Sequence, residues 1–520
     1  MYIWCKPAAA SVFKHTRMWP QDSAMLSLHS AKAMAVSGQI CMRQDDRHFT
    51  ITGVDFEGVP QGVEAQYNFT DYFTYNDGVP MPDILSTKPT VEVLMNATQT
   101  IIVTFRVSEE ALPATYTIKA TVHTSLGDFM ATFCLCVHPV VLPAPKDSIY
   151  GMEYFLNPMG YFPMHTPMKN PPVTPFYPHL RYDEGWWDLM GEFAKHLKDM
   201  RVNTLHLPIM SLLCDGGSRR VGEGQWVLEF GLLDKFVEFF LAHGSFRYIS
   251  VSAIISSVNG KTMQAIDENS DVTWFEVFSA EADSWAEAYY GGLYRHFEER
   301  GWLSMLQMRL QDEPHSPEYW QWAKDKCRIY MPDVVCGEPL DTHSVARQLA
   351  GYCDQYIPRL EVYEEGADFY LERQRAGDQV WCYCCCFPEE MGWMNKFTDW
   401  PVVHSRLIHW ACFSHGITGF LHWGYNYWDH QLYGLNPNAR YKGDGFIVYP
   451  DVANNGLMDS LRGVNTRDGM QDWELLHLLE QKNPEAAKAI ARRIARAFND
   501  IHATDADVEA ARVEILTMLS

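Results

Sequence analysis

Residues 304–314 read Ser304-Met-Leu-Gln-Met-Arg-Leu-Gln-Asp-Glu-Pro314, a run in which apolar and polar side chains alternate before two acids and a proline. A period of two is typical of a β-strand, and it places one set on each face: Leu306, Met308 and Leu310 opposite Gln307, Arg309 and Gln311. Pro314 cannot donate to a hydrogen-bond ladder, so we expect the strand to end before it. By the same parity Glu313 follows the polar face, and Asp312 joins it only if the strand twists at its end.

Similar short apolar segments flank this stretch and alternate with amphipathic helices. The eight predicted strands are Tyr150–Leu156, Thr204–Ile209, Arg247–Ile255, Ser304–Gln311, Asp333–Gly337, Gln355–Leu360, Gln379–Phe387 and Gly419–Gly424. The clearest predicted helices are Asp183–Met200, with Asp183 as its cap, Leu232–His243, Ala282–Arg300, Ser316–Tyr330 and Thr398–His415. Eight strand–helix repeats without a glycine-rich phosphate fingerprint favour an α/β fold of the (β/α)8 TIM-barrel type over an open doubly wound sheet.

The amino-terminal part has a different pattern, with β-type runs at Gly62–Phe69, Thr100–Val107, Thr115–Ser125 and Phe129–Leu142. These runs predict an antiparallel β-sandwich, and the proline-containing segment Leu142–Asp147 predicts a linker. We therefore expect a β-sandwich domain at 1–145, a catalytic barrel at 146–483 and a C-terminal helical extension at 484–520.

Composition narrows the classes of partner. A formal charge of −23 and a pI near 5.3 disfavour nucleic-acid and membrane-surface binding, and no apolar run approaches the roughly 20 residues that span a bilayer. The first twenty residues lack the pattern of a secretion signal, and the count of 13 cysteines is odd. These features predict a cytoplasmic protein, and they leave homo-oligomer formation open.

Asp312 and Glu313 are the candidate catalytic pair. Catalytic groups of such barrels lie at the carboxyl ends of the strands. Two adjacent carboxyl groups repel when both are ionised, which keeps one protonated beside a charged partner, as glycoside cleavage requires. We expect no cofactor and no metal, because no His-x-His follows the first strand, no His-Glu-x-x-His is present, and the cysteines at 382–386 lack zinc spacing.

Aromatic and amide side chains gather at two predicted strand ends. Pyranose rings present apolar C–H faces that stack on flat side chains, so such residues are candidates for sugar contact. The candidate substrate-binding residues are Trp381, Tyr383, His422, Trp423, Tyr425, Asn426 and Trp428.

At these residues the chain resembles the family known as domain of unknown function 4091, which is related to glycoside hydrolase family 123. The resemblance rests on Met81-Pro-Asp-Ile-Leu85, Ala114-Thr-Tyr-Thr117, Asp312-Glu313-Pro314, Gly419-Phe-Leu-His-Trp-Gly424, Ser460-Leu-Arg462 and Arg467-Asp-Gly-Met-Gln-Asp-Trp-Glu-Leu-Leu476. It implies a β-sandwich followed by a barrel, and an exo-acting β-N-acetylhexosaminidase, with β-N-acetylgalactosaminidase activity favoured and a small oligosaccharide or glycoside as the expected substrate partner.

The resemblance also implies a substrate-assisted retaining mechanism, in which the acetamido oxygen of the sugar attacks the anomeric carbon. Glu313 would then be the general acid and later the base, and Asp312 would orient the acetamido group. The residues Trp381, Tyr383, Trp423 and Asn426 would enclose that group.

Two alternatives remain open. One is an ordinary retaining glycosidase in which Glu313 is the acid/base and Glu389 or Glu390 is a covalent nucleophile. The other is a non-catalytic carbohydrate-binding protein.

Overall fold

The computed structural model describes residues 1–74, 78–158, 176–256, 260–428 and 442–520. They form two compact units. The sheet unit consists of Met1–Ala144, Glu389–Gly416 and the described part of His430–Ser520, and the barrel unit consists of Pro145–Pro388 and the described part of Ile417–Asp429.

The barrel unit is built on parallel strands, and each of the eight predicted strands is confirmed. The strands of the resulting nine-stranded sheet are β11 (Gly151–Tyr154), β12 (Thr204–Leu207), β15 (Tyr248–Val251), β18 (Leu306–Met308), β19 (Val335–Leu340), β20 (Gln355–Pro358), β21 (Gln379–Val380), β22 (Cys382–Cys384) and β23 (Gly419–His422). The sheet order is β21-β20-β19-β18-β15-β12-β11-β23-β22. The predicted seventh strand is split into β21 and β22, and a parallel bridge from Arg359 to Tyr383 joins β22 to the end of β20. The result is a nearly closed parallel barrel.

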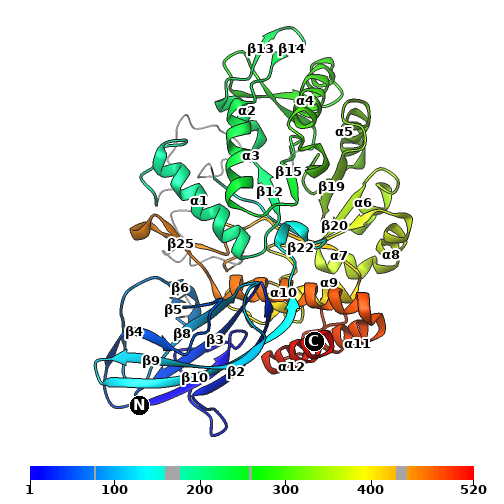
Figure 1. The fold of residues 1–520 in the computed structure, drawn as a ribbon. Coiled ribbons are helices and arrows are strands. Elements are labelled where there is room, and N and C mark those ends of the chain that lie inside the picture. The colour runs from blue at the N-terminus through cyan, green and yellow to red at the C-terminus, as the bar shows by residue number, and fades with distance from the viewer. Residues whose placement is uncertain (75–77, 159–175, 257–259, 429–441) are drawn as a thin grey trace. The chain divides into compact units, whose positions relative to one another are not determined.

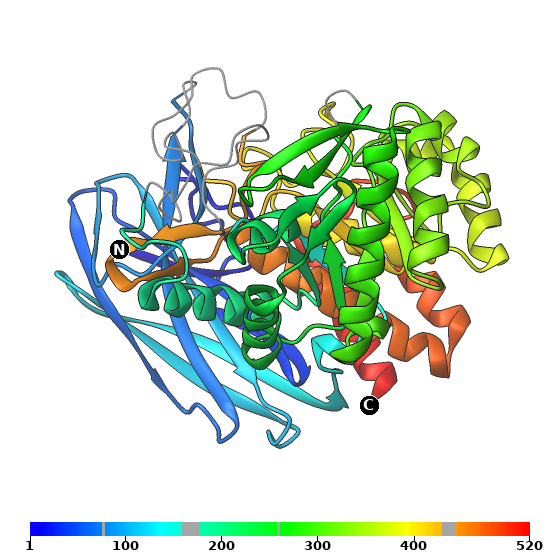
Figure 2. The same cartoon turned by 90° about the horizontal axis from the view of Figure 1, so that it is seen from above.

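Helices of the barrel unit lie outside these strands (Figures 1 and 2). They are α1 (Glu184–Asp199), α2 (Ile209–Asp215), α3 (Gly231–His243), α4 (Ala280–Glu299), α5 (Pro317–Tyr330), α6 (His343–Gln348), α7 (Leu360–Glu365) and α8 (Ala367–Ala376). The Asp183 carboxylate accepts the backbone N–H of Trp186 at 2.7 Å, which confirms the predicted cap of α1. Two hairpins follow the second and third barrel strands: β13 (Arg219–Gly222) with β14 (Gln225–Val227), and β16 (Thr262–Ile266) with β17 (Val272–Glu276).

The barrel interior holds the polar face predicted for β18. Arg309 donates to Glu153 of β11 and to Gln355 of β20, each at 2.6 Å. Burial opposes ionisation of Glu153, but Arg309 and then His206 outweigh it and lower its pKa to about 2. These charged and polar side chains therefore link four strands, directly below the carboxyl ends of those strands.

The sheet unit begins with two five-stranded sheets, of order β1-β3-β8-β5-β6 and β2-β10-β9-β4-β7. Their strands are β1 (Tyr2–Pro7), β2 (Met25–Lys32), β3 (Met34–Arg43), β4 (Phe49–Glu57), β5 (Val63–Thr74), β6 (Pro80–Ser86), β7 (Val91–Val93), β8 (Thr98–Val107), β9 (Ala114–Thr124) and β10 (Gly127–Val141). All pairs are antiparallel except β10 with the edge strand β2. Phe105 of the first sheet meets Phe133 of the second edge to face, with ring centroids 5.3 Å apart.

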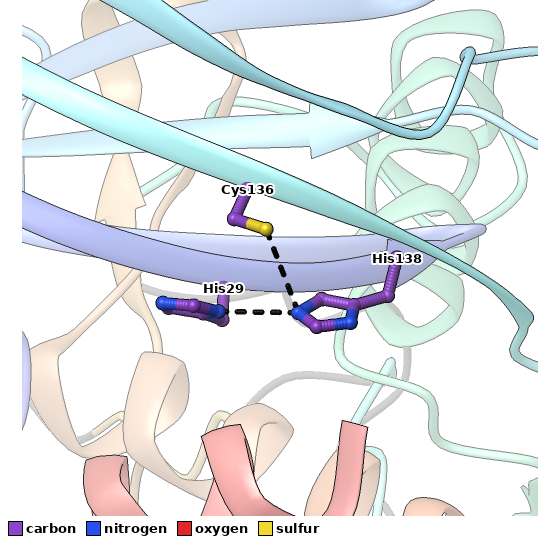
Figure 3. Close-up of side chains that lie close together, drawn as sticks. All are labelled: His29, Cys136 and His138. Carbon is purple, nitrogen blue, oxygen red and sulfur yellow. Dashed lines mark hydrogen bonds between the residues drawn. The ribbon is translucent and has the colours of Figure 1, made fainter. Parts of the chain in front are cut away.

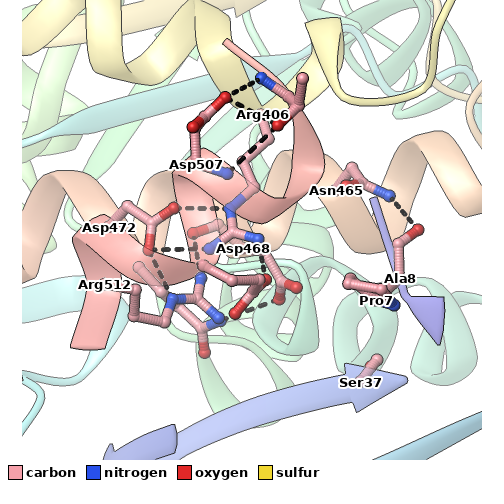
Figure 4. Close-up of polar contacts among 12 residues, drawn as sticks. Pro7, Ala8, Ser37, Arg406, Asn465, Asp468, Asp472, Asp507 and Arg512 are labelled. Atoms are coloured by element: carbon pink, nitrogen blue, oxygen red, sulfur yellow. Dashed lines mark hydrogen bonds and ion pairs between the residues drawn. The ribbon is translucent and has the colours of Figure 1, made fainter. Parts of the chain in front are cut away.

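The remaining elements of the sheet unit are β24 (Tyr449–Asp451), β25 (Gly456–Met458), α9 (His404–Ser414), α10 (Leu461–Lys482), α11 (Pro484–Ile494) and α12 (Asp505–Leu519). Asp472 of α10 accepts 2.6 Å hydrogen bonds from Arg406 of α9 and Arg512 of α12 (Figure 4). The helix predicted at 398–415 starts only at His404, because Pro401 is poorly tolerated inside a helix.

This division differs from the predicted domains in one respect: α9 and α10 fall within the predicted barrel range 146–483 but belong to the sheet unit. The buried ion pair of Arg406 with Asp472, which also pairs with Arg512, is the physical link between them. The boundaries at 145 and 483 stay a prediction. Among the described residues, no helix combines the length and apolar character needed to cross a bilayer.

Candidate active site

Two backbone N–H groups that follow β18 bind a carboxyl group of the neighbouring strand β19. The backbone N–H groups of Leu310 and Gln311 donate to Glu338 Oε2 of β19, at 2.7 and 3.1 Å. The indole N–H of Trp320 on α5 donates to the same oxygen at 2.8 Å. Glu338 is fully buried, and this burial raises its pKa to about 8 against the opposing effect of its donors. Glu338 therefore supports the segment that immediately precedes the two acids.

The chain turns sharply at the second acid. Glu313 has a φ of +45°, in the left-handed region, which costs roughly 1 kcal/mol for a residue with a side chain. Its carboxylate accepts a hydrogen bond from the hydroxyl of Tyr383 on β22. Strained backbone of this kind persists only where surrounding contacts hold it, and it is frequent at functional sites.

Asp312 is partly exposed at the strand end but closely surrounded by protein atoms. That burial, followed by the neighbouring charges of Glu313 and Asp341, raises its pKa to about 7, and Arg309 opposes the shift. At neutral pH the carboxyl group of Asp312 can therefore hold a proton beside that of Glu313, which accepts a hydrogen bond. This arrangement supplies an acid and a base to one bound molecule.

The predicted aromatic residues separate into two groups. Tyr383 lies on the inner face with its hydroxyl at Glu313, and Trp423 follows β23 with partial exposure and a 5.0 Å ring contact to Tyr427. Trp381 is 1 % exposed and lies against Gly151 and Gly419, the first residues of β11 and β23. That position favours core packing for Trp381.

Three other candidates are also enclosed. The hydroxyl of Tyr425 lies 2.9 Å from His196 Nδ1 of α1, and Trp428 packs on Phe193 of α1 with centroids 6.1 Å apart. His422 packs on Tyr154, and its Nδ1 accepts the backbone N–H of Gly424 at 3.0 Å. These side chains lie towards the helices and favour a structural role.

Asn426 joins the loops after the first and last barrel strands. Its side chain accepts the backbone N–H of Asn157 at 2.8 Å and donates to the carbonyl of Asn157 at 2.9 Å. A double hydrogen bond of this kind fixes the loop that follows β11 at the same end of the barrel.

Sequence reasoning missed three contributors: Glu338, Asp341 and Arg359, whose charge acts on the hydroxyl of Tyr383. Asp341 and Arg359 directly follow β19 and β20, so a search of every strand end for charged residues would have found them. Glu338 lies within a strand, and its role depends on contacts that no spacing indicates. Glu389 and Glu390, the alternative nucleophiles, belong to the sheet unit, and Glu390 is exposed.

Among the residues that the structure describes, the side chains with metal-ligand proximity are His29, Cys136 and His138 in the sheet unit. The geometry at Asp312 and Glu313 is that of an acid pair.

Comparisons with known proteins agree with a carbohydrate-cleaving barrel. The family model for the glycoside hydrolase 123 catalytic domain matches residues 173–479, a range that contains both acids. No curated protein sequence matches the chain.

The chain is similar in fold to a family 123 glycoside hydrolase from Clostridium perfringens, whose structure was analysed for glycolipid glycan hydrolysis. The TM-score is 0.75 at 14% identity, over 100% of this chain and 97% of that one. A cyclomaltodextrinase overlaps more weakly, with a TM-score of 0.32 at 10% identity over 90% of this chain and 84% of that one. With a catalytic-domain match over more than half of its 520 residues, the chain belongs to glycoside hydrolase family 123.

Proposed function

We propose that this glycoside hydrolase is an exo-acting β-N-acetylhexosaminidase with a substrate-assisted retaining mechanism, and that N-acetylgalactosamine is its preferred sugar. The observation that carries the proposal is the pair at the end of β18, with Asp312 at a pKa of about 7 and Glu313 hydrogen-bonded by Tyr383. Membership of family 123 supports the glycosidic bond as the bond that is cleaved.

In the first step the acetamido oxygen of the sugar forms a bond to the anomeric carbon as the bond to the departing oxygen breaks. Glu313 gives its proton to that oxygen, and an oxazoline-type ring results. In the second step water attacks the anomeric carbon, Glu313 takes a proton from it, and the ring opens. The bound sugar supplies the nucleophile. The protein supplies the proton and orients the acetamido group.

The proton has a defined path in this scheme. Asp312 holds a proton over much of the neutral range in the free protein. An acetamido N–H that donates to Asp312 favours the ionised form of this carboxyl, and Glu313 is the adjacent residue that can receive the proton. Substrate binding would thereby protonate Glu313 only when the sugar carries a 2-acetamido group.

Substrate contacts are assigned to the residues nearest the pair. Tyr383 and Trp423 would face the sugar, and Asn426 would hold the loop after β11 beside it. Packing observations support roles behind the site for Trp381, Tyr425 and Trp428. We further propose that the barrel unit forms a (β/α)8 barrel. We also propose that the two amino-terminal sheets form a sandwich, which the contact between Phe105 and Phe133 supports.

The substrate is proposed to be a glycan or small glycoside that ends in a β-linked N-acetylgalactosamine. The fold similarity to the Clostridium perfringens enzyme supports glycolipid glycans as one source of such ends.

The test uses a panel of aryl β-glycosides of N-acetylgalactosamine, N-acetylglucosamine and galactose. We expect turnover of the first, and a fall in kcat of roughly 10²-fold or more for Glu313→Gln and for Asp312→Asn. A thiazoline mimic of the ring intermediate should inhibit the wild type.

Three results would redirect the assignment. Near-wild-type rates in both variants would remove the catalytic pair. Resistance to the thiazoline together with loss of turnover in Glu389→Gln or Glu390→Gln would favour a covalent nucleophile. Sugar binding without turnover of any aryl glycoside would favour a binding protein.

A further inference from the structure

Three potential metal ligands gather in the sheet unit, on one face of a strand pair (Figure 3). His29 of β2 is the register partner of Cys136 of β10, and His138 lies two residues further along β10, so all three side chains share a face. His29 Nδ1 lies 3.1 Å from His138 Nε2, and Cys136 Sγ lies 3.6 Å from the same nitrogen.

The proton on His138 can be assigned from its other neighbour. The hydroxyl of Ser520 donates its proton to the carbonyl of Leu516 at 2.7 Å, so it can only accept at its 2.9 Å contact with His138 Nδ1. His138 Nδ1 therefore carries the hydrogen, and Nε2 presents a lone pair to His29 and Cys136. Metal-binding histidines commonly donate their second N–H in this way, which fixes the tautomer and the ring orientation.

The distances are compatible with a tetrahedral ion bound by all three side chains. With Zn–N of about 2.0–2.1 Å and Zn–S of about 2.3 Å, tetrahedral angles place two nitrogens about 3.3 Å apart and nitrogen and sulfur about 3.6 Å apart. The observed separations of 3.1 and 3.6 Å require only small side-chain adjustments.

We propose that His29 Nδ1, Cys136 Sγ and His138 Nε2 bind one Zn²⁺ ion, with water as the fourth ligand. Two imidazoles and one thiolate suit a borderline-soft ion of this kind. On binding, Cys136 releases its thiol proton to solvent, and His29 keeps one proton, on Nε2. The ion would fasten the edge strand β2 to β10, and through His138 and Ser520 it would also hold the end of α12 (Asp505–Leu519).

The experiment uses the full chain after removal of metal with a chelator, and Co²⁺ as the spectroscopic probe. We expect one Co²⁺ per chain, with tetrahedral visible bands and a near-ultraviolet thiolate charge-transfer band, both displaced by Zn²⁺. Cys136→Ser should abolish the charge-transfer band, and His29→Gln should weaken Co²⁺ binding at least tenfold. Cys134→Ser is the matched control, because Cys134 is also a partly buried cysteine on this face of β10.

A thermal shift provides an independent readout, since an ion that binds only the folded chain raises Tm. Zn²⁺ should raise Tm in the wild type and in Cys134→Ser, and not in Cys136→Ser or His29→Gln. If Cys136→Ser does not fold, His29→Gln decides the question. Absence of cobalt bands in the wild type, or equal Co²⁺ binding and Zn²⁺ shifts in wild type and His29→Gln, would overturn the proposal.

Discussion

The hydroxyl of Tyr383 donates a hydrogen bond to the carboxylate of Glu313, which lies 70 positions earlier in the chain. Tyr383 is only 3 % exposed, and burial and the Glu313 charge raise its pKa well above the ordinary value. The hydroxyl therefore keeps its proton across the neutral pH range. Tyr383 thus orients Glu313, the proposed acid, from inside the barrel. Because its own hydroxyl stays protonated, Tyr383 does not take up the proton of Glu313.

Removal of this hydroxyl should reduce catalysis more than binding. Tyr383→Phe keeps the ring packed against Ile357 and Leu421 and deletes a hydrogen bond to a charged group, worth about 1.5–3 kcal/mol. We expect kcat on an aryl β-N-acetylgalactosaminide to fall about tenfold or more, with KM within about twofold.

Tyr356→Phe is the matched control. Tyr356 is buried on strand β20, and its hydroxyl donates to the carbonyl of Leu349 at 3.0 Å. An equal loss of kcat in both variants would show a general packing effect and would contradict the orienting role of Tyr383.

Glu338 should act through the backbone that it supports. Its pKa of about 8 makes the neutral form dominant at pH 7, so Glu338→Gln preserves shape and an acceptor oxygen, and kcat should stay within about threefold. Glu338→Leu leaves the N–H groups of Leu310 and Gln311 without their acceptor, at a cost of about 1–3 kcal/mol each.

For Glu338→Leu we expect a lower Tm and a fall in kcat of about tenfold or more with little change in KM. Steady-state kinetics at pH 7 and thermal unfolding measure the two effects. The positioning role would be excluded by a leucine variant that loses stability but turns over substrate as fast as the glutamine variant.

Ionisation of Asp312 should destabilise the folded chain. Its pKa rises from 3.8 to about 7 on folding, so between these values the folded state binds more protons than the unfolded state. The free energy of unfolding therefore falls as the pH rises from about 4 to about 7, by at most about 4 kcal/mol and by less because the carboxyl is partly exposed.

Asp312→Asn imitates the neutral carboxyl and should remove this decline. The variant should be more stable than the wild type by about 1–3 kcal/mol at pH 8, and the difference should vanish near pH 4. Denaturant unfolding of both proteins across this range measures the difference. A difference that does not vary with pH would refute the raised pKa.

The ion pairs in the sheet unit predict a second pH dependence, of opposite sign. Burial opposes the ionisation of Asp472, but Arg406 and Arg512 outweigh it and lower its pKa. Its stabilising contribution is therefore present above the unfolded-state pKa of about 4 and is lost as the pH falls further.

Asp472→Asn should destabilise the chain by about 3–5 kcal/mol, because the buried Arg512 guanidinium loses its carboxylate partner and Arg406 keeps only Glu509. Thermal unfolding at pH 7 measures this loss. Asp46→Asn removes the fully exposed pair with Arg47 and should leave Tm unchanged. Equal Tm values for Asp472→Asn and the wild type would show that the buried pairs contribute nothing.

Local patterns predicted most of the elements because they reflect local physics. The alternation at 304–311 predicted β18 and the shared face of Gln307, Arg309 and Gln311, and Asp183 predicted the start of α1 through its cap. The same patterns did not distinguish Trp381, Tyr383, Tyr425 and Trp428, all of which were predicted to contact the substrate. Trp381 packs on two glycines near the strand starts, whereas Tyr383 is hydrogen-bonded to Glu313.

By itself, the sequence determined the order of strands and helices, the face on which each strand residue lies, and the position of the two acids at a strand end. Those properties follow from side-chain period, proline chemistry and burial, which act over a few residues. Only the tertiary structure decided that Glu338 supports that end, that Tyr383 reaches Glu313 and that Glu313 adopts a left-handed turn. Each of these depends on atoms from distant strands meeting within hydrogen-bond range, and no local period encodes which residues will meet.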